Sequence, residues 1–335
     1  MTALLEIHDL RKFFETRRGP FGAEISVVRA VDGVSFTVER GEAFGLVGES
    51  GCGKSTVGRL ALRLIDPDEG SITFEGEEIA DQSRRSLRHL RRRMQMIFQD
   101  PYSSLNPKMT VGRILGEPLK VHGITPSGDI PARVSELLAE VGLPADAASR
   151  YPHEFSGGQR QRIAIARALS VDPEFIVADE PVSALDVSIQ AQVLDLMRNL
   201  LEKRGLGFLF ISHDLGVVRY FCQRLAVMYL GRIVEVGAVP GIFDEPLHPY
   251  TKALRAASPV PDPTVGRTLA RLEGEVPSAS NPPSGCHFHP RCPHATDLCR
   301  RTYPAWTEMG DGRAVACHLY DPASAGEMST PSEKA

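Results

Sequence analysis

Residues 43–56 read AFGLVGESGCGKST, and this stretch decides the fold. Its first five residues, Ala43 to Val47, form a short apolar run that leads into a glycine-rich turn. An Ala- and Leu-rich helical pattern follows from Lys54 to Leu64. A buried strand, a tight turn and a helix in this order are typical of α/β proteins with a parallel sheet. We therefore expect the chain to be built around such a sheet.

The glycine-rich turn fits the pattern of a phosphate-binding loop that follows a strand and opens a helix. Its glycines allow backbone N–H groups to turn inward around a β-phosphate, and the helix N-terminus adds the positive end of its dipole. Lys54 can bridge the β- and γ-phosphates, and Ser55 supplies a hydroxyl for Mg²⁺. The expected contacts to ATP in this loop are Gly48, Ser50, Gly51, Gly53, Lys54, Ser55 and Thr56.

Two adjacent carboxylates end a second apolar run, Phe175 to Ala178. Because side chains alternate along a strand, Asp179 and Glu180 point in different directions and can take different roles. Asp179 is expected to hold Mg²⁺, and Glu180 to orient or deprotonate the water that attacks the γ-phosphate. These two residues predict phosphoryl chemistry beside the phosphate loop.

A second glycine-rich turn, Ser156-Gly157-Gly158-Gln159, stands at the start of the helical run Arg160 to Ser170. Such a turn at a helix N-terminus can also cradle a phosphate. With the phosphate loop upstream and the two acids downstream, the turn resembles the signature motif of the ATP-binding cassette (ABC) family. The resemblance implies that the signature motif of one subunit meets the phosphate loop of another, with ATP held between them.

The resemblance assigns roles to further residues of this chain. Gln99, after the apolar run Met94 to Phe98, resembles the glutamine that contacts Mg²⁺ and the attacking water. His213 resembles the switch histidine that contacts the γ-phosphate, and Asp186 ends a loop that resembles the link between the two ATP sites of a dimer. Phe14 occupies the place of the aromatic ring that stacks on adenine. Gln99, Glu180 and His213 are therefore the candidate catalytic residues.

The resemblance also implies an architecture. We expect an α/β fold with an ABC-type nucleotide-binding domain over residues 1–258, consisting of a RecA-like parallel-sheet core, an antiparallel β subdomain and an inserted helical subdomain at about 101–165. Leu4 to Ile7 and Val34 to Val38 alternate as antiparallel strands do, and Glu15 to Glu24 is expected to be a loop. Gly207 to Ile211 is expected to be another buried strand. A C-terminal extension with a small cysteine module should span residues 259–335.

Two segments resemble the ATPases of oligopeptide and dipeptide permeases: Gln99 to Pro107 (QDPYSSLNP) and His248 to Leu254 (HPYTKAL). The resemblance implies a subunit that hydrolyses ATP to energise import of small peptides. The implied partners are a second, related ATPase, two integral membrane permease subunits and, indirectly, an external peptide-binding protein. The chain would then act at the cytoplasmic face of the membrane. Nickel and other solute importers use similar ATPases, and soluble ABC ATPases of DNA repair or translation are a more distant alternative.

The composition agrees with a folded ATPase subunit that contains no membrane channel. Of 335 residues, 42% are hydrophobic and 24% are charged, which is ordinary for a globular chain. No stretch approaches the roughly 20 apolar residues that a transmembrane helix requires. The formal net charge of −4 argues against a general nucleic-acid surface, so no nucleic-acid partner is expected.

Four of the six cysteines, Cys286, Cys292, Cys299 and Cys317, lie in the last part of the chain. Four thiolates can hold a tetrahedral Zn²⁺ ion or an iron–sulfur cluster. Structural zinc sites usually contain closely spaced cysteine pairs, which this spacing lacks. The permease resemblance implies a [4Fe-4S] cluster in at least some relatives. Zinc and free thiols remain the alternatives at this point.

Overall fold

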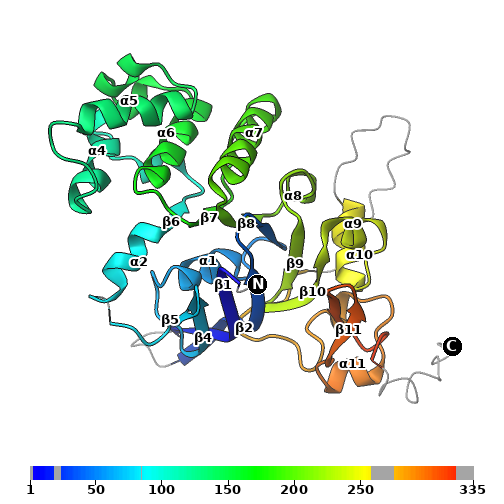
Figure 1. Ribbon diagram of the computed structural model, residues 1–335. Helices are drawn as coiled ribbons and strands as arrows, with labels where there is room; N and C mark the ends of the chain where they lie inside the picture. Colours follow the sequence, from blue (N-terminus) through cyan, green and yellow to red (C-terminus); the bar gives the residue numbers. More distant parts are fainter. Residues whose placement is uncertain (1–2, 19–23, 84, 258–274, 322–335) are drawn as a thin grey trace, which may run out of the picture.

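The computed structural model describes residues 3–18, 24–83, 85–257 and 275–321. Two sheets share these residues with a group of helices that lies to one side of them (Figure 1). The expected α/β architecture, with its antiparallel, parallel and helical parts, is confirmed. Within the described residues, no helix is long and apolar enough to cross a bilayer.

The smaller sheet is antiparallel and contains the first two strands of the chain. Its order is β2 (Glu24–Val38), β1 (Leu5–Arg18), β4 (Glu69–Phe74) and β5 (Glu77–Glu78). The expected loop at residues 15–24 was wrong in part, because residues 15–18 continue β1 and pair with residues 24–27. The glycines and arginines of this stretch favoured a loop, but the hydrogen bonds of the neighbouring strand outweigh that preference. Residues 19–23 of that expected loop lie outside the described residues.

Among the described residues, the larger sheet has eight strands and a parallel centre. In sheet order they are β11 (Trp306–Gly310), β12 (Arg313–Ala316), β10 (Arg232–Ala238), β9 (Arg224–Tyr229), β3 (Ala43–Val47), β8 (Gly207–Ser212), β7 (Phe175–Asp179) and β6 (Met94–Ile97). The strands from β9 to β6 run parallel to one another. Every residue of β3, β7 and β8 is buried, as the continuous apolar runs predicted. These strands fix the position of the loops that follow them.

The helical part follows β6 in the sequence. It contains α3 (Pro101–Ser104), α4 (Val111–Val121), α5 (Ile130–Glu140), η2 (Ala145–Ser149), η3 (Pro152–Glu154) and α6 (Gly157–Leu169). Figure 1 shows α4, α5 and α6 grouped together, away from β1, β2 and β4. Their contacts with one another bury Leu115, Leu137 and Ile163. The inserted helical subdomain therefore has apolar side chains of its own to bury.

The remaining helices cover the larger sheet and its C-terminal edge. They are α1 (Lys54–Ala61), α2 (Leu87–Arg93), α7 (Val187–Arg204), α8 (Leu215–Phe221), α9 (Val239–Asp244), α10 (Pro249–Ala257), η4 (His289–Arg291) and α11 (Asp297–Arg301). Helix α1 ends before the expected Leu64, because Arg63 adopts a left-handed backbone with φ 49°. Helix α2 buries only Leu87 and Leu90, so its arginine-rich remainder forms a solvated face.

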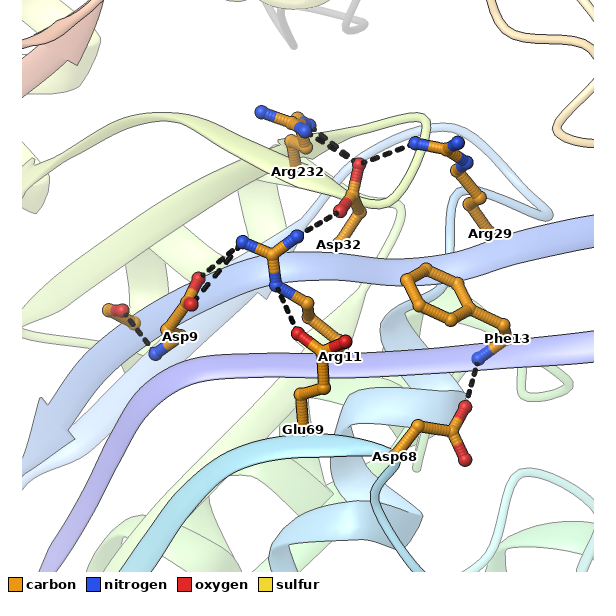
Figure 2. Close-up of polar contacts among 9 residues, drawn as sticks. Asp9, Arg11, Phe13, Arg29, Asp32, Asp68, Glu69 and Arg232 are labelled. Carbon is orange, nitrogen blue, oxygen red and sulfur yellow. Dashed lines mark hydrogen bonds and ion pairs between the residues drawn. The ribbon is translucent and has the colours of Figure 1, made fainter.

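A buried carboxylate joins the two sheets. Asp32 of β2, 1% exposed, accepts hydrogen bonds from Arg232 of β10 at 2.7 and 2.9 Å and from Arg11 of β1 at 3.3 Å. Figure 2 shows these groups, with Arg29 as a more distant partner whose Nη1 lies 3.9 Å from Asp32. The backbone N–H of Asp32 also donates to Gly231. The contacts hold the antiparallel sheet against the core sheet beside the loop that follows β3.

Residues 275–321 pack on the core instead of standing apart from it. Strand β12 pairs with β10, and β11 pairs with β12, so both extend the core sheet. Figure 1 shows β11 and α11 beside β10 and α10. The buried ring of Phe288 contacts Tyr229 and Tyr250, which belong to β9 and α10. The C-terminal segment and the nucleotide-binding part therefore share one core.

Candidate nucleotide-binding site

The loop between β3 and α1 is pressed closely against its neighbours. A Cβ atom on Gly53, whose φ is 110°, would lie 2.0 Å from the carbonyl oxygen of Ala30. A Cβ on Gly48 would lie 2.2 Å from the carbonyl oxygen of Met228. Only glycine fits these two positions, since the backbone of adjacent strands occupies the space of any side chain. The turn therefore presents backbone to its open side, where Ser50 and Gly51 are exposed.

Lys54 keeps its ammonium group inside this loop. Its side chain is buried, and Nζ donates hydrogen bonds to the carbonyl oxygens of Gly48 at 2.8 Å and Glu49 at 3.0 Å. The carbonyl groups of the loop thus hold the positive charge of Lys54 inside the turn. A phosphate bound there would meet this charge and the N-terminus of α1 together. Thr56, the last residue of the expected phosphate-contacting set, is half-buried in the first turn of the helix.

Ser55 and Asp179 form a pair of oxygen ligands. The Ser55 hydroxyl donates to Oδ1 of Asp179 at 2.9 Å. Burial raises the pKa of Asp179, and the hydrogen bond from Ser55 opposes this only in part. A carboxylate that burial disfavours gains from a divalent cation beside it, and Mg²⁺ prefers such oxygen ligands. The two residues therefore fit the expected Mg²⁺ site.

Glu180 lies between the two other candidate catalytic residues. Its Oε2 accepts a hydrogen bond from Nε2 of Gln99 at 2.9 Å, and its Oε1 lies 3.1 Å from Nδ1 of His213. Gln99 follows β6, Glu180 follows β7 and His213 follows β8, which are neighbouring parallel strands. Their carboxyl ends meet at one edge of the sheet, where the phosphate loop after β3 also lies. Glu180 has a φ of 48°, a left-handed conformation that glutamate seldom adopts.

The second glycine-rich turn lies in a different part of the structure. Ser156 caps α6: its hydroxyl accepts from the N–H of Gln159, and the Gln159 side chain accepts from the N–H of Ser156. A Cβ on Gly158 would lie 2.3 Å from Cγ2 of Ile189, so the glycine lets α6 approach α7. Gly157, the first residue of α6, faces Leu185. Helix α6 packs on β6 and the helical part, whereas α1 packs on β2, β7 and β8.

Two further predicted residues lie at the surface. Asp186 precedes α7 and is exposed, and the next residue, Val187, is 82% exposed. Phe14 is 40% exposed on β1, and the ammonium of Lys12 lies 5.7 Å from its ring centroid. Its neighbour Phe13 is less exposed, and its backbone N–H donates to Asp68. Phe14 therefore offers the freer aromatic face of the pair.

The structure adds two contacts to the phosphate loop that sequence reasoning missed. The hydroxyl of Tyr250, a fully buried residue of α10, accepts the N–H of Glu49 at 2.9 Å. The guanidinium of Arg291 forms two hydrogen bonds with the carboxylate of Glu49. Tyr250 belongs to the HPYTKAL segment, whose pattern was informative only as a resemblance. No local signal links residues so far apart in the sequence.

The four C-terminal cysteines line one cavity, together with His248 and Phe288. All are free thiols. Burial raises the pKa of Cys286 to about 12 and that of Cys317 to about 11, and it also raises the pKa of Cys292. Within the described part of the chain, no group of three or more His, Cys, Asp or Glu is arranged to hold a metal ion.

Comparisons with known proteins agree with this geometry. Residues 31–183 match the ABC transporter family, and residues 234–299 match the C-terminal region of oligopeptide/dipeptide transporters. The probable peptide ABC transporter ATP-binding protein y4tS of Sinorhizobium fredii is 54% identical over 98% of this chain and 93% of its own length. The oligopeptide transport ATP-binding protein AppF of Bacillus subtilis is 52% identical, over 95% of this chain and 97% of its own.

A solved dimeric ATP-binding cassette, in a post-hydrolysis state bound to ADP and Pi, superposes with a TM-score of 0.62. It is 28% identical and covers 70% of this chain and 98% of its own. Three findings lead to one assignment: relatives that match over nearly the whole chain at above 50% identity, the phosphate loop, and the two acids at the end of β7. The chain belongs to the ABC transporter family, as an ATP-hydrolysing subunit that carries the oligopeptide/dipeptide transporter C-terminal region.

Proposed function

We propose that this chain hydrolyses ATP to energise a membrane importer of dipeptides or oligopeptides. The observation that carries the hydrolytic part is the Glu180 carboxylate between Gln99 and His213, at the sheet edge that also holds the Ser55 and Asp179 pair. The peptide cargo is supported by relatives named as peptide or oligopeptide transport proteins. An importer of nickel or another solute is the alternative.

In the proposed mechanism each residue has one task. The phosphate loop and Lys54 bind the β- and γ-phosphates, and Ser55 and Asp179 hold Mg²⁺, which when bound neutralises phosphate charge. Glu180 orients the attacking water and accepts its proton, while Gln99 and His213 keep the carboxylate in place from two sides. His213 is half exposed, so it can also reach the γ-phosphate. Phe14 stacks on the adenine ring.

We further propose that the working assembly pairs this chain with a second, related ATPase. Ser156, Gly157, Gly158 and Gln159 lie away from the chain's own phosphate loop, so they would contact the ATP of the partner. The exposed Asp186 and Val187 suit the surface between the two ATP sites. Two integral membrane permease subunits would receive the resulting movement at the cytoplasmic face of the membrane. An external peptide-binding protein would deliver cargo without contacting this chain.

Reconstitution tests the proposal directly. The chain would be placed in liposomes with two membrane permease subunits and a second, related ATPase, and uptake of labelled di- and oligopeptides would be measured. We expect ATP-dependent uptake when the binding protein is present, and none with Glu180→Gln. Uptake of a nickel chelate without peptide uptake would favour the alternative. Binding to DNA or ribosomes without membrane subunits would contradict both.

We also propose that the cysteine cavity holds a [4Fe-4S] cluster. The support is the placement of Cys286, Cys292, Cys299 and Cys317 around one cavity, because a cubane takes its thiolates from separate directions. The raised pKa values mean that binding must first displace thiol protons. The cluster would stabilise a segment that has few apolar side chains of its own, and a redox role is not needed.

Anaerobic purification followed by iron and sulfide analysis tests this second proposal. About four iron and four sulfide per chain are expected. Cys292→Ser should lower both, whereas Cys222→Ser should not, since Cys222 is buried in the ATPase core away from the cavity. A colourless protein with stoichiometric zinc, or one without metal, would reject the cluster.

A further inference from the structure

One arginine of the C-terminal segment, residues 275–321, contacts the phosphate loop. Arg291 ends the short helix η4, between Cys286 and Cys292 in the sequence. Its Nη1 donates to Oε2 of Glu49 at 2.9 Å, and its Nη2 donates to Oε1 at 3.0 Å. Glu49 is the second residue of the phosphate loop. The pair therefore joins the C-terminal segment to the loop by a two-pronged, charge-assisted contact.

Aromatic residues fix the direction of the arginine. Its side chain is only 4% exposed, and its guanidinium lies 6.0 Å from the ring centroids of both Tyr229 and Phe288. The backbone of Glu49 is held in the same place, because its N–H donates to the Tyr250 hydroxyl. Both the backbone and the carboxylate of Glu49 are thus bound by residues outside the phosphate loop. Such a contact limits the positions that the loop can adopt.

A second part of the C-terminal segment lies beside the same loop. Val276, Pro277 and Ala279 line a cavity together with residues 49–52. The carbonyl oxygen of Ala279 accepts the N–H of Arg29 from β2 at 3.3 Å. The segment therefore lies beside the loop at a second place, which does not involve Arg291.

The negative charge of Glu49 gives its contact with Arg291 a consequence for nucleotide binding. The loop must receive the negative phosphates of ATP, yet its second residue carries a negative charge. Arg291 neutralises that charge and holds the carboxylate toward the C-terminal segment. Without the arginine, a half-buried carboxylate would remain unpaired beside the bound phosphates and would oppose their binding.

We propose that Arg291 is a positioning residue for ATP, which acts by holding and neutralising Glu49 of the phosphate loop. The proposal rests on the assignment of residues 48–56 as that loop. The C-terminal segment is then part of the nucleotide-binding machinery, and any opening of the Cys286 to Cys292 segment would release Glu49.

Binding of Mg-ADP, measured by calorimetry on the full chain, tests this role without turnover. Arg291→Met should weaken the affinity roughly tenfold, as expected for the loss of hydrogen bonds to a charged group. Glu49→Gln alone should weaken the affinity less than Arg291→Met does, because the amide oxygen still accepts from Arg291 and leaves no unpaired negative charge. The double variant Arg291→Met with Glu49→Gln should recover most of the lost affinity. In the assembled ATPase, Arg291→Met should raise KM for ATP far more than it lowers kcat.

Arg300→Met is the matched control. Arg300 lies in the same segment, and its side chain is 60% exposed beside Asp297. It should bind Mg-ADP like wild type. Arg291→Gln serves as a second variant if Arg291→Met does not fold, because the amide keeps a hydrogen-bond donor toward Glu49. Arg291→Gln should likewise bind Mg-ADP more weakly than wild type, and adding Glu49→Gln to it should recover affinity.

The outcomes separate this proposal from the assignment of the loop. Wild-type affinity in the Arg291 variants, or a double variant no better than the single one, would overturn the role of Arg291. In the second case the arginine would be only a structural support of its segment. Failure of the wild-type chain to bind Mg-ADP would instead contradict the assignment of residues 48–56.

Discussion

Replacement of Glu180 by glutamine tests the proposed mechanism most directly. The carboxylate accepts from Gln99 with one oxygen and faces His213 with the other. An amide can serve only one of these neighbours as acceptor, and it cannot take a proton from water. Turnover should fall by about 10²- to 10⁴-fold, the usual contribution of a general base, which corresponds to about 3 to 5 kcal/mol of barrier. ATP affinity should stay unchanged, since Lys54 and the Ser55 and Asp179 pair are untouched.

Phosphate release would be measured in the assembled ATPase, and ATP binding by equilibrium dialysis. Glu174→Gln is the control, because Glu174 precedes the same strand at its opposite end and pairs with Arg93 and Arg40. That variant should keep full turnover and lose under about 1 kcal/mol of stability, as half-exposed ion pairs contribute little. Turnover within threefold of wild type for Glu180→Gln would refute the role of Glu180. Equal losses in both variants would indicate damage to the strand instead.

Three other changes have expected outcomes. Asp32→Ala should lower the free energy of unfolding by about 3 to 5 kcal/mol in urea titrations, because it leaves Arg11 and Arg232 facing each other without their buried partner; a loss under 1 kcal/mol would contradict this. Ser55→Ala should raise the Mg²⁺ concentration for half-maximal ATPase activity by about tenfold, whereas Ser55→Thr should not; identical midpoints would remove Ser55 from the metal site. Ser156→Arg should block one nucleotide per paired assembly, and a Lys54→Ala, Ser156→Arg double variant should block two. If the double variant blocked only one, the head-to-tail arrangement would be wrong.

The sequence predicted the parts of the site that depend on strand ends. Ala43 to Val47 and Phe175 to Ala178 are apolar throughout, so their place in a parallel sheet and the position of the residues after them could be inferred. The structure brings Gln99 and His213 beside Glu180 because three neighbouring strands end together. The chemical roles of these residues stay predictions until the variants are measured.

What the sequence could not predict depends on contacts between distant segments. Arg291 and Glu49 are 242 positions apart, and a charge in a proline-rich segment gives no indication of its partner. Residues 15–18 were expected to lie in a loop because residues 15–24 contain glycines and arginines, but the opposite strand determines the conformation of residues 15–18. Strand β11 is short and largely exposed, so no apolar pattern marked it as part of the core sheet.

The pairing of β12 with β10 has a consequence for synthesis of the chain. Strand β10 is synthesised before β11 and β12. Its outer backbone groups therefore stay unpaired until β12 has been made and has folded onto it. An open sheet edge readily accepts strands from other molecules. A premature stop before Arg313 would therefore do more than remove an appendage. The outer edge of β10 would keep unpaired backbone N–H and C=O groups, and we expect the shortened protein to aggregate into inclusion bodies.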